Sequence, residues 1–64
     1  MGLIEIIENY GWALTVEELA ELTCISEKTI RRHIKAGKLP AYHIGALVRL
    51  DPHETAEWLR SRLR

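Results

Sequence analysis

The sequence predicts a mainly α-helical fold with a small β-hairpin, arranged as a winged helix-turn-helix. The first observation is a pair of short amphipathic helical segments separated only by residues 23–25. A link this short holds two helices as a close, angled pair. The second observation is the alternation of apolar and polar residues over residues 42–50, which is typical of a hairpin or wing. We expect the winged domain to span residues 14–64, with residues 1–13 as an N-terminal helical extension.

The first helix of the pair is predicted at about residues 16–22. Thr15 is a suitable N-cap, and Glu18 follows three residues later to complete a capping box. Leu14 and Leu19 have the spacing of a hydrophobic staple. We therefore expect a firmly closed helix start whose apolar face points into the core.

The second helix is predicted at residues 27–36, between an N-cap at Ser26 and a left-handed C′ glycine at Gly37. At about 100° per residue, Ile30, His33 and Ile34 gather on one side. The opposite arc carries the cations Lys28, Arg31, Arg32 and Lys35, with Thr29 at its edge. One face is thus expected to enter the core and the other to meet a charged partner.

The wing is predicted at residues 42–50, after Pro40 has prevented the helix from continuing. A three-residue turn at residues 45–47 would join its two strands. Because a lone two-stranded hairpin is marginal in water, we expect it to pack on the helices. The predicted inner pairs are Ile44 with Val48 and Tyr42 with Leu50, while His43 and Arg49 would point outward together.

Two further helices complete the prediction. Asp51 as N-cap and Pro52 at the first helical position begin a helix that runs to about residue 61. Its expected apolar stripe is Ala56, Trp58, Leu59 and Leu63, with Trp58 anchoring the core. At the other end, residues 3–10 predict a short helix closed by Gly11 that covers the core, together with Trp12.

Length and residue types exclude several classes of function. A chain of 64 residues has no room for an enclosed substrate pocket with a catalytic shell. No Gly-rich phosphate loop is present, and Cys24 and the histidines His33, His43 and His53 do not have the spacing of a zinc site. We therefore expect no enzyme, no cofactor, no metal and no small-molecule substrate, and we interpret Cys24 as a small apolar filler of the turn.

The expected location is the cytoplasm. A single cysteine suits a reducing compartment, and no apolar run approaches the length of a membrane span. No membrane partner is expected.

The distribution of charge favours a nucleic-acid partner although the net charge is zero. Residues 1–23 hold five acidic residues and no Lys or Arg, whereas residues 24–64 hold all nine basic residues against four acidic ones. Such asymmetry indicates one acidic and one basic face. We therefore interpret residues 27–36 as a recognition helix for the major groove of double-stranded DNA. The residues expected at base edges are Lys28, Thr29 and Arg32, those expected at phosphates are Lys35, Lys38 and Arg49, and Arg31 could serve either role.

The block S-x-x-T-I-R-R from Ser26, followed by A-G-K-L-P-A-Y, resembles the excisionase-type helix-turn-helix domains, which are related to the DNA-binding end of the MerR superfamily. The resemblance covers residues 14–59. It implies that the chain is a recombination directionality factor or a small transcriptional regulator. The partners it implies are double-stranded DNA, with an integrase or recombinase or further copies of the chain on the DNA. It also implies DNA contacts by Lys28, Thr29, Arg31 and Arg32 and wing contacts by His43 and Arg49.

Three positions depart from that family pattern. Cys24 replaces the usual Gly of the turn, which fits if Cys24 stays out of the left-handed region. His43 stands where Arg or Lys is common, and the tip, residues 45–47, lacks an Arg. We expect Leu47 to fold back onto the domain; an exposed Leu47 would instead contact a partner protein or a minor groove. A helix-turn-helix repurposed for protein binding therefore stays open as the alternative function.

Overall fold

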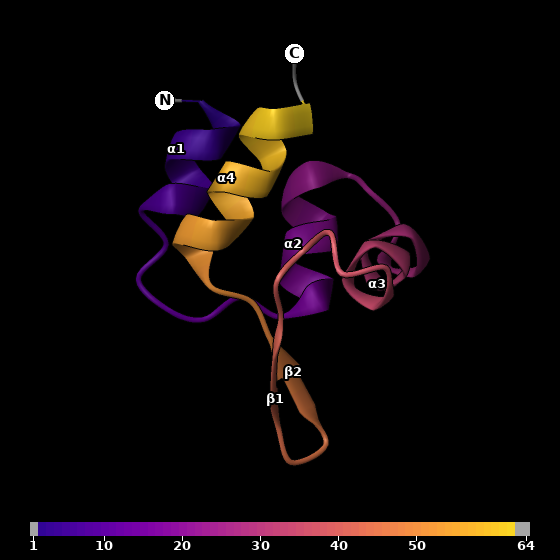
Figure 1. The fold of residues 1–64 in the computed structure, drawn as a ribbon. Coiled ribbons are helices and arrows are strands. Elements are labelled where there is room, and N and C mark those ends of the chain that lie inside the picture. Colours follow the sequence, from indigo (N-terminus) through magenta and orange to yellow (C-terminus); the bar gives the residue numbers. More distant parts are fainter. Residues whose placement is uncertain (1, 63–64) are drawn as a thin grey trace.

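The computed structural model describes residues 2–62, in which four short helices surround one core and a hairpin projects from them (Figure 1). α1 (Leu3–Glu8) packs beside α4 (Pro52–Arg62), and α2 (Val16–Thr23) and α3 (Glu27–Lys35) form the angled pair. This confirms the predicted mainly helical fold with a two-stranded wing. The elements in chain order are α1 (Leu3–Glu8), α2 (Val16–Thr23), α3 (Glu27–Lys35), β1 (Tyr42–Ile44), β2 (Leu47–Arg49) and α4 (Pro52–Arg62).

The predicted caps of the helix pair are present. Thr15 Oγ1 accepts a hydrogen bond from the Glu18 N–H at 2.9 Å, and the Glu18 carboxylate accepts one from the Thr15 N–H at 2.9 Å. Ser26 Oγ accepts from the Thr29 N–H at 3.2 Å at the start of α3. Gly37 follows α3 with φ of 76°, as its left-handed role requires.

The turn between α2 and α3 differs from the prediction at Cys24. Cys24 adopts the left-handed conformation with φ of 60°, and its side chain is exposed, so it is not an apolar filler. The reversal of direction in so short a link requires one left-handed residue. Thr23 supports the turn: its hydroxyl donates to the Leu19 carbonyl at 2.7 Å and accepts from the Ile25 N–H at 3.3 Å.

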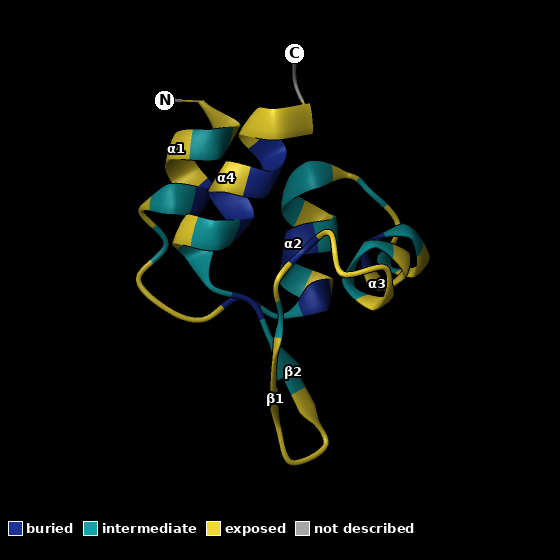
Figure 2. Cartoon of the chain, in the orientation of Figure 1, coloured by how far each residue is buried: buried dark blue, intermediate teal, exposed yellow. Residues whose placement is uncertain are grey.

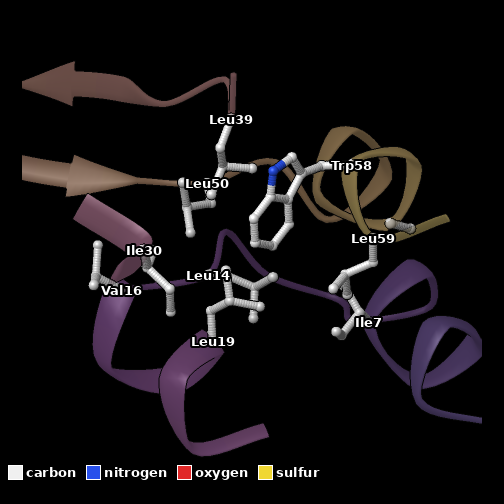
Figure 3. Packing of buried hydrophobic residues seen from close by; sticks show 10 residues of the cluster. Ile7, Leu14, Val16, Leu19, Ile30, Leu39, Leu50, Trp58 and Leu59 are labelled. Atoms are coloured by element: carbon white, nitrogen blue, oxygen red, sulfur yellow. The ribbon is translucent and has the colours of Figure 1, made fainter. Parts of the chain in front are cut away.

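The core joins all four helices to the base of the wing (Figure 3). Trp58 is only 6% exposed, which confirms its predicted anchoring role. The edge of the His33 ring meets the Trp58 ring with centroids 5.4 Å apart. Leu63 lies outside the described residues. The buried apolar residues are Ile7, Leu14, Val16, Leu19, Ile30, Leu39, Leu50, Ala56, Trp58 and Leu59.

The N-terminal segment covers the core as predicted, but without Trp12. α1 ends at Glu8, two residues earlier than expected, and its Ile7 is fully buried. The Arg60 guanidinium of α4 holds Glu8 with an N–O distance of 2.7 Å. Trp12 is 80% exposed because the chain bends at residues 11 and 12 and Leu14 enters the core instead.

The register of the hairpin differs from the predicted one by a residue. β1 and β2 are antiparallel with Ile44 opposite Leu47, His43 opposite Val48 and Tyr42 opposite Arg49. The turn has two residues rather than three, with Gly45 at φ of 61°, the conformation that two-residue hairpin turns favour. Because a shift of one residue exchanges the faces of a strand, the expected inner pairs are wrong, and His43 and Arg49 lie on opposite faces.

Only the base of the wing is attached to the helical body. Leu50 is buried, and its backbone forms two hydrogen bonds with Leu14, of 2.9 and 2.8 Å. The tip is exposed, with Ile44 at 64% and Leu47 at 53%, so Leu47 does not fold back (Figure 2). The expected packing of the hairpin on the helices is therefore confirmed at the base, where Leu50 is buried and Val48 packs against the core. It is wrong for the tip, since the two-residue turn places Ile44 and Leu47 at the far end of the projecting strands.

Candidate nucleic-acid interface

The outer arc of α3 forms a cationic surface whose direction is fixed by the core. Ile30 is fully buried, so the residues on the other side of the helix must face solvent. His33 and Ile34, predicted on the inner side, are half-buried. Thr29 is half-buried at the edge of the arc, where its Oγ1 accepts a hydrogen bond from the Ser26 hydroxyl at 2.9 Å. The exposed members of the arc are Lys28, Arg31, Arg32 and Lys35.

Arg31 differs from the other three cations because two carboxylates hold it. Its guanidinium lies 3.1 Å from Glu27 on the same helix and 3.7 Å from Glu17 on α2. Within residues 2–62, Lys28, Arg32 and Lys35 form no ion pair. Their charge is consequently the more available to an anionic partner.

A groove of about 500 Å³ separates α3 from the wing. Both walls supply basic side chains, and among residues 2–62 Glu17 is the single acidic side chain that lines the groove. The groove also reaches the tip of the wing through Ala46 and Leu47. The structure thus brings together four predicted site residues, Arg31, Lys35, His43 and Arg49.

The remaining predicted site residues lie outside this groove. Lys28, Thr29 and Arg32 occupy the α3 surface beyond it, in the first two turns of the helix. Lys38 is exposed just after α3, and its N–H donates to the His33 carbonyl at 2.9 Å. The eight residues therefore divide between the α3 surface, the wing-side groove and the segment after α3, and they do not converge on one pocket.

Comparison with known protein families identifies the helix-turn-helix motif formed by α2 and α3. The family model described as a helix-turn-helix domain matches residues 13–63. The chain belongs to this helix-turn-helix family. No curated protein and no solved structure matches the chain. Helix-turn-helix domains are typically non-enzymatic DNA-binding modules, and the second helix of such a motif typically reads DNA. In this chain α3 has that place in the motif.

Arg49 lines the groove of this helix-turn-helix domain, although the observed register differs from the predicted one. It is half-buried, and its guanidinium donates to the Val48 carbonyl at 2.8 Å. Although His43 and Arg49 belong to opposite faces of the hairpin, both line the groove.

His33 does not add to the cationic surface. Burial lowers the pKa of His33, and the nearby charges of Arg62, Lys38 and Arg32 lower it further. The imidazole packs edge-on against the Trp58 ring. His33 is accordingly a packing residue of the helix-turn-helix domain.

Sequence reasoning missed the acidic contribution to the interface. The spacing of Glu27 and Arg31, four residues apart on a helix, is a signal that could have identified that ion pair. Glu17 carries no such signal, because its contact with Arg31 depends on the angle between α2 and α3.

Two further findings concern the described part of the chain. Among residues 2–62, no group of three or more His, Cys, Asp or Glu side chains is arranged to hold a metal ion. No helix within the same residues is both long and apolar enough to cross a membrane.

Proposed function

We propose that this helix-turn-helix domain binds double-stranded DNA sequence-specifically, as an excisionase-like recombination directionality factor or a small transcriptional regulator. The observation that carries the proposal is the exposed cationic arc of α3 next to a basic groove. An α-helix fits the major groove of DNA, and Lys and Arg on its outer face reach both phosphates and guanine acceptors.

The two parts of the surface correspond to two parts of a duplex. Lys28, Thr29 and Arg32 lie in the early turns of α3, the part of a recognition helix that contacts base edges. The phosphate strand between the major and minor grooves would then lie in the groove between α3 and the wing. Lys35 and Arg49 neutralise its phosphates, with His43 as a hydrogen-bond partner. Lys38 and Arg31 contact phosphates at the edges of this footprint.

We further propose that residues 14–64 are the DNA-binding unit and residues 1–13 an extension. α1 stabilises the unit, since Ile7 joins the core and Glu8 binds Arg60 of α4. Leu3 and Ile6 are 36% and 39% exposed on α1, which makes this helix a candidate for self-association of copies on DNA.

The direct test is a titration of the domain against random-sequence and element-end duplexes at two salt concentrations. We expect affinity to fall with salt, because each phosphate contact releases counterions. The Arg31/Arg32 double alanine variant should lose most of the binding, and Arg32→Ala alone should cost about 1–3 kcal/mol.

Arg60→Gln is the matched control, because it also removes one positive charge but lies on α4 and keeps a hydrogen-bond donor for Glu8. It should bind as the wild type does. Absence of binding at low salt by the folded wild type would overturn the proposal. If the protein is an excisionase-like factor, its gene should lie beside an integrase gene and the protein should bind at the ends of the element. A regulator should instead bind at promoters.

A protein-binding function is the second candidate, favoured by one observation. Trp12, Tyr42 and Ile44 are exposed and line a second groove of about 650 Å³ on the other side of the wing. If this groove carries the function, partner binding will be unaffected by Arg32→Ala and reduced by Trp12→Ala.

A further inference from the structure

The tip of the wing is apolar and uncovered. Ile44 and Leu47 lie directly opposite each other across the hairpin, so their side chains share one face. They are 64% and 53% exposed, and Gly45 and Ala46 form the turn between them. Residues 44–48 include no charged or hydrogen-bonding side chain. This pair therefore forms an apolar point at the end of a projecting arm (Figure 1).

The apolar tip is continuous with the basic groove. Leu47 and Ala46 line the groove next to α3, while Ile44 lines the second groove on the other side of the wing. The shared apolar face of the tip thus borders both grooves. A ridge of this shape is suited to entering a narrow cleft.

The base of the wing holds the tip in a defined direction. Leu50 is buried and bridged to Leu14 by two backbone hydrogen bonds. The Tyr42 hydroxyl donates to Glu54 of α4 at 2.9 Å. The base is therefore attached to both α4 and the segment before α2, and the tip lies beside α3, where Leu47 lines the groove.

We propose that Ile44 and Leu47 form a wedge that enters the minor groove, inserts between two base pairs and kinks the DNA. The inference rests on the proposed DNA binding. With α3 in the major groove and the phosphate strand between α3 and the wing, the tip meets the adjoining minor groove. A tip without side-chain donors is poorly suited to reading the base acceptors there, but Ile and Leu are side chains that proteins insert at base steps.

The wedge predicts which DNA the protein prefers. Inserting a side chain separates stacked bases, and pyrimidine–purine steps such as TA yield most easily. The preferred duplex should therefore contain a TA or CA step one groove away from the bases contacted by α3. Sequence preference at that step would come from deformability, without a hydrogen bond to any base.

The test is ligase-catalysed circle formation by a DNA fragment of about 150 base pairs, close to the persistence length of DNA. Wild-type protein should raise the yield of circles at least about tenfold, since a kink brings the ends of a stiff fragment together. The Ile44→Ala/Leu47→Ala variant, compared at equal occupancy, should leave the yield at that of free DNA. Its affinity should stay within about tenfold of wild type, because the lost contacts are offset by avoided unstacking.

Trp12→Ala is the matched control, because it removes another large exposed apolar side chain that lies off the wing. It should raise the yield of circles as the wild type does. Both variants change exposed side chains, so thermal denaturation should show the wild-type midpoint for each.

Two results would overturn the wedge. The first is a double variant that promotes circles as well as wild type does, and the second is wild-type protein that binds without promoting them. In the first case, loss of self-association in the double variant, seen by sedimentation, would assign the tip to a second copy. Failure of the proposed function gives a different result, namely no binding of the fragment by the wild type at low salt.

Discussion

The helix-turn-helix pair and the wing both face the proposed DNA, yet they are built in opposite ways. α2 and α3 carry three side-chain caps at Thr15, Glu18 and Ser26 and bury Leu19 and Ile30 completely. The wing has short strands whose outer part buries no side chain. In the pair the apolar residues are inside and the charges outside, whereas the apolar residues of the wing tip are exposed.

Because of this difference, the residues that stabilise the fold and the residues that face the proposed DNA are linked in the helix pair but separate in the wing. In the helix pair the same helix supplies a core residue, Ile30, and the cationic arc, so that folding fixes the position of the charges. In the wing only Leu50, at the base, belongs to the core. Substitutions at the tip should therefore change binding or DNA shape and leave the free energy of unfolding unchanged.

The largest expected effect tests this separation with the same substitution in both regions. Ile30→Ala should lower the free energy of unfolding by about 2–4 kcal/mol, because Ile30 is fully buried and its loss leaves a cavity. Ile44→Ala should change it by no more than about 0.5 kcal/mol, since Ile44 is 64% exposed. Denaturation in urea followed by circular dichroism measures both. Equal losses of unfolding free energy in the two variants would show that the Ile44 side chain is packed against the rest of the protein in solution.

The next effect compares one hydrogen bond in each region. Thr15→Ala removes the N-cap of α2 and should cost about 1 kcal/mol. Tyr42→Phe removes the exposed hydrogen bond to Glu54 and should cost less than about 0.5 kcal/mol. The same urea experiment applies. A larger loss of unfolding free energy for Tyr42→Phe than for Thr15→Ala would mean that the hydrogen bond at the wing base stabilises the fold more than the cap of α2 does.

The same contrast explains what could be predicted from the sequence. The caps at Thr15 and Ser26, the wheel of α3 and the start of α4 at Asp51 depend on residues within four positions of one another, and all were correct. The hairpin register was wrong because it depends on whether the turn holds two or three residues, and Gly45 permits both. Trp12 was misplaced because an apolar residue type does not determine burial when Leu14 competes for the same core.

At the candidate site, local periodicity identified the cationic arc but not its acidic partners. Lys28, Arg32 and Lys35 are exposed as the wheel predicted. The contact of Glu17 with Arg31 joins residues fourteen positions apart and follows from the crossing of α2 and α3. The roles of the eight site residues in DNA binding stay predictions.

A smaller effect tests whether Glu17 restrains DNA binding. Glu17 lines the groove proposed for a phosphate strand and pairs with Arg31 at 3.7 Å. Glu17→Gln should raise DNA affinity about two- to fivefold, because it removes a repulsive charge and frees Arg31 from an exposed ion pair of modest strength. Fluorescence anisotropy with a labelled duplex at low salt measures this change.

Glu21→Gln is the control for Glu17→Gln, since it removes the same charge from the exposed surface of the same helix. Glu21 forms no ion pair among residues 2–62, and it does not line the groove. It should raise the affinity less than Glu17→Gln does. Equal increases would show that only the net charge matters and that the groove does not hold a phosphate strand.

The smallest effect concerns pH and contrasts His33 in the helix pair with His43 on the wing. Burial beside Trp58 lowers the pKa of His33 below its usual 6.5, and Arg62, Lys38 and Arg32 act in the same direction. The unfolded chain therefore takes up a proton near pH 6.5 that the folded chain does not, so stability falls as the pH drops below that value. His33→Phe keeps a ring against Trp58 and should flatten the decline in urea midpoint between about pH 7 and 5.5. His43→Phe, on the exposed wing, should retain the wild-type decline; the same decline in His33→Phe would assign it to other groups.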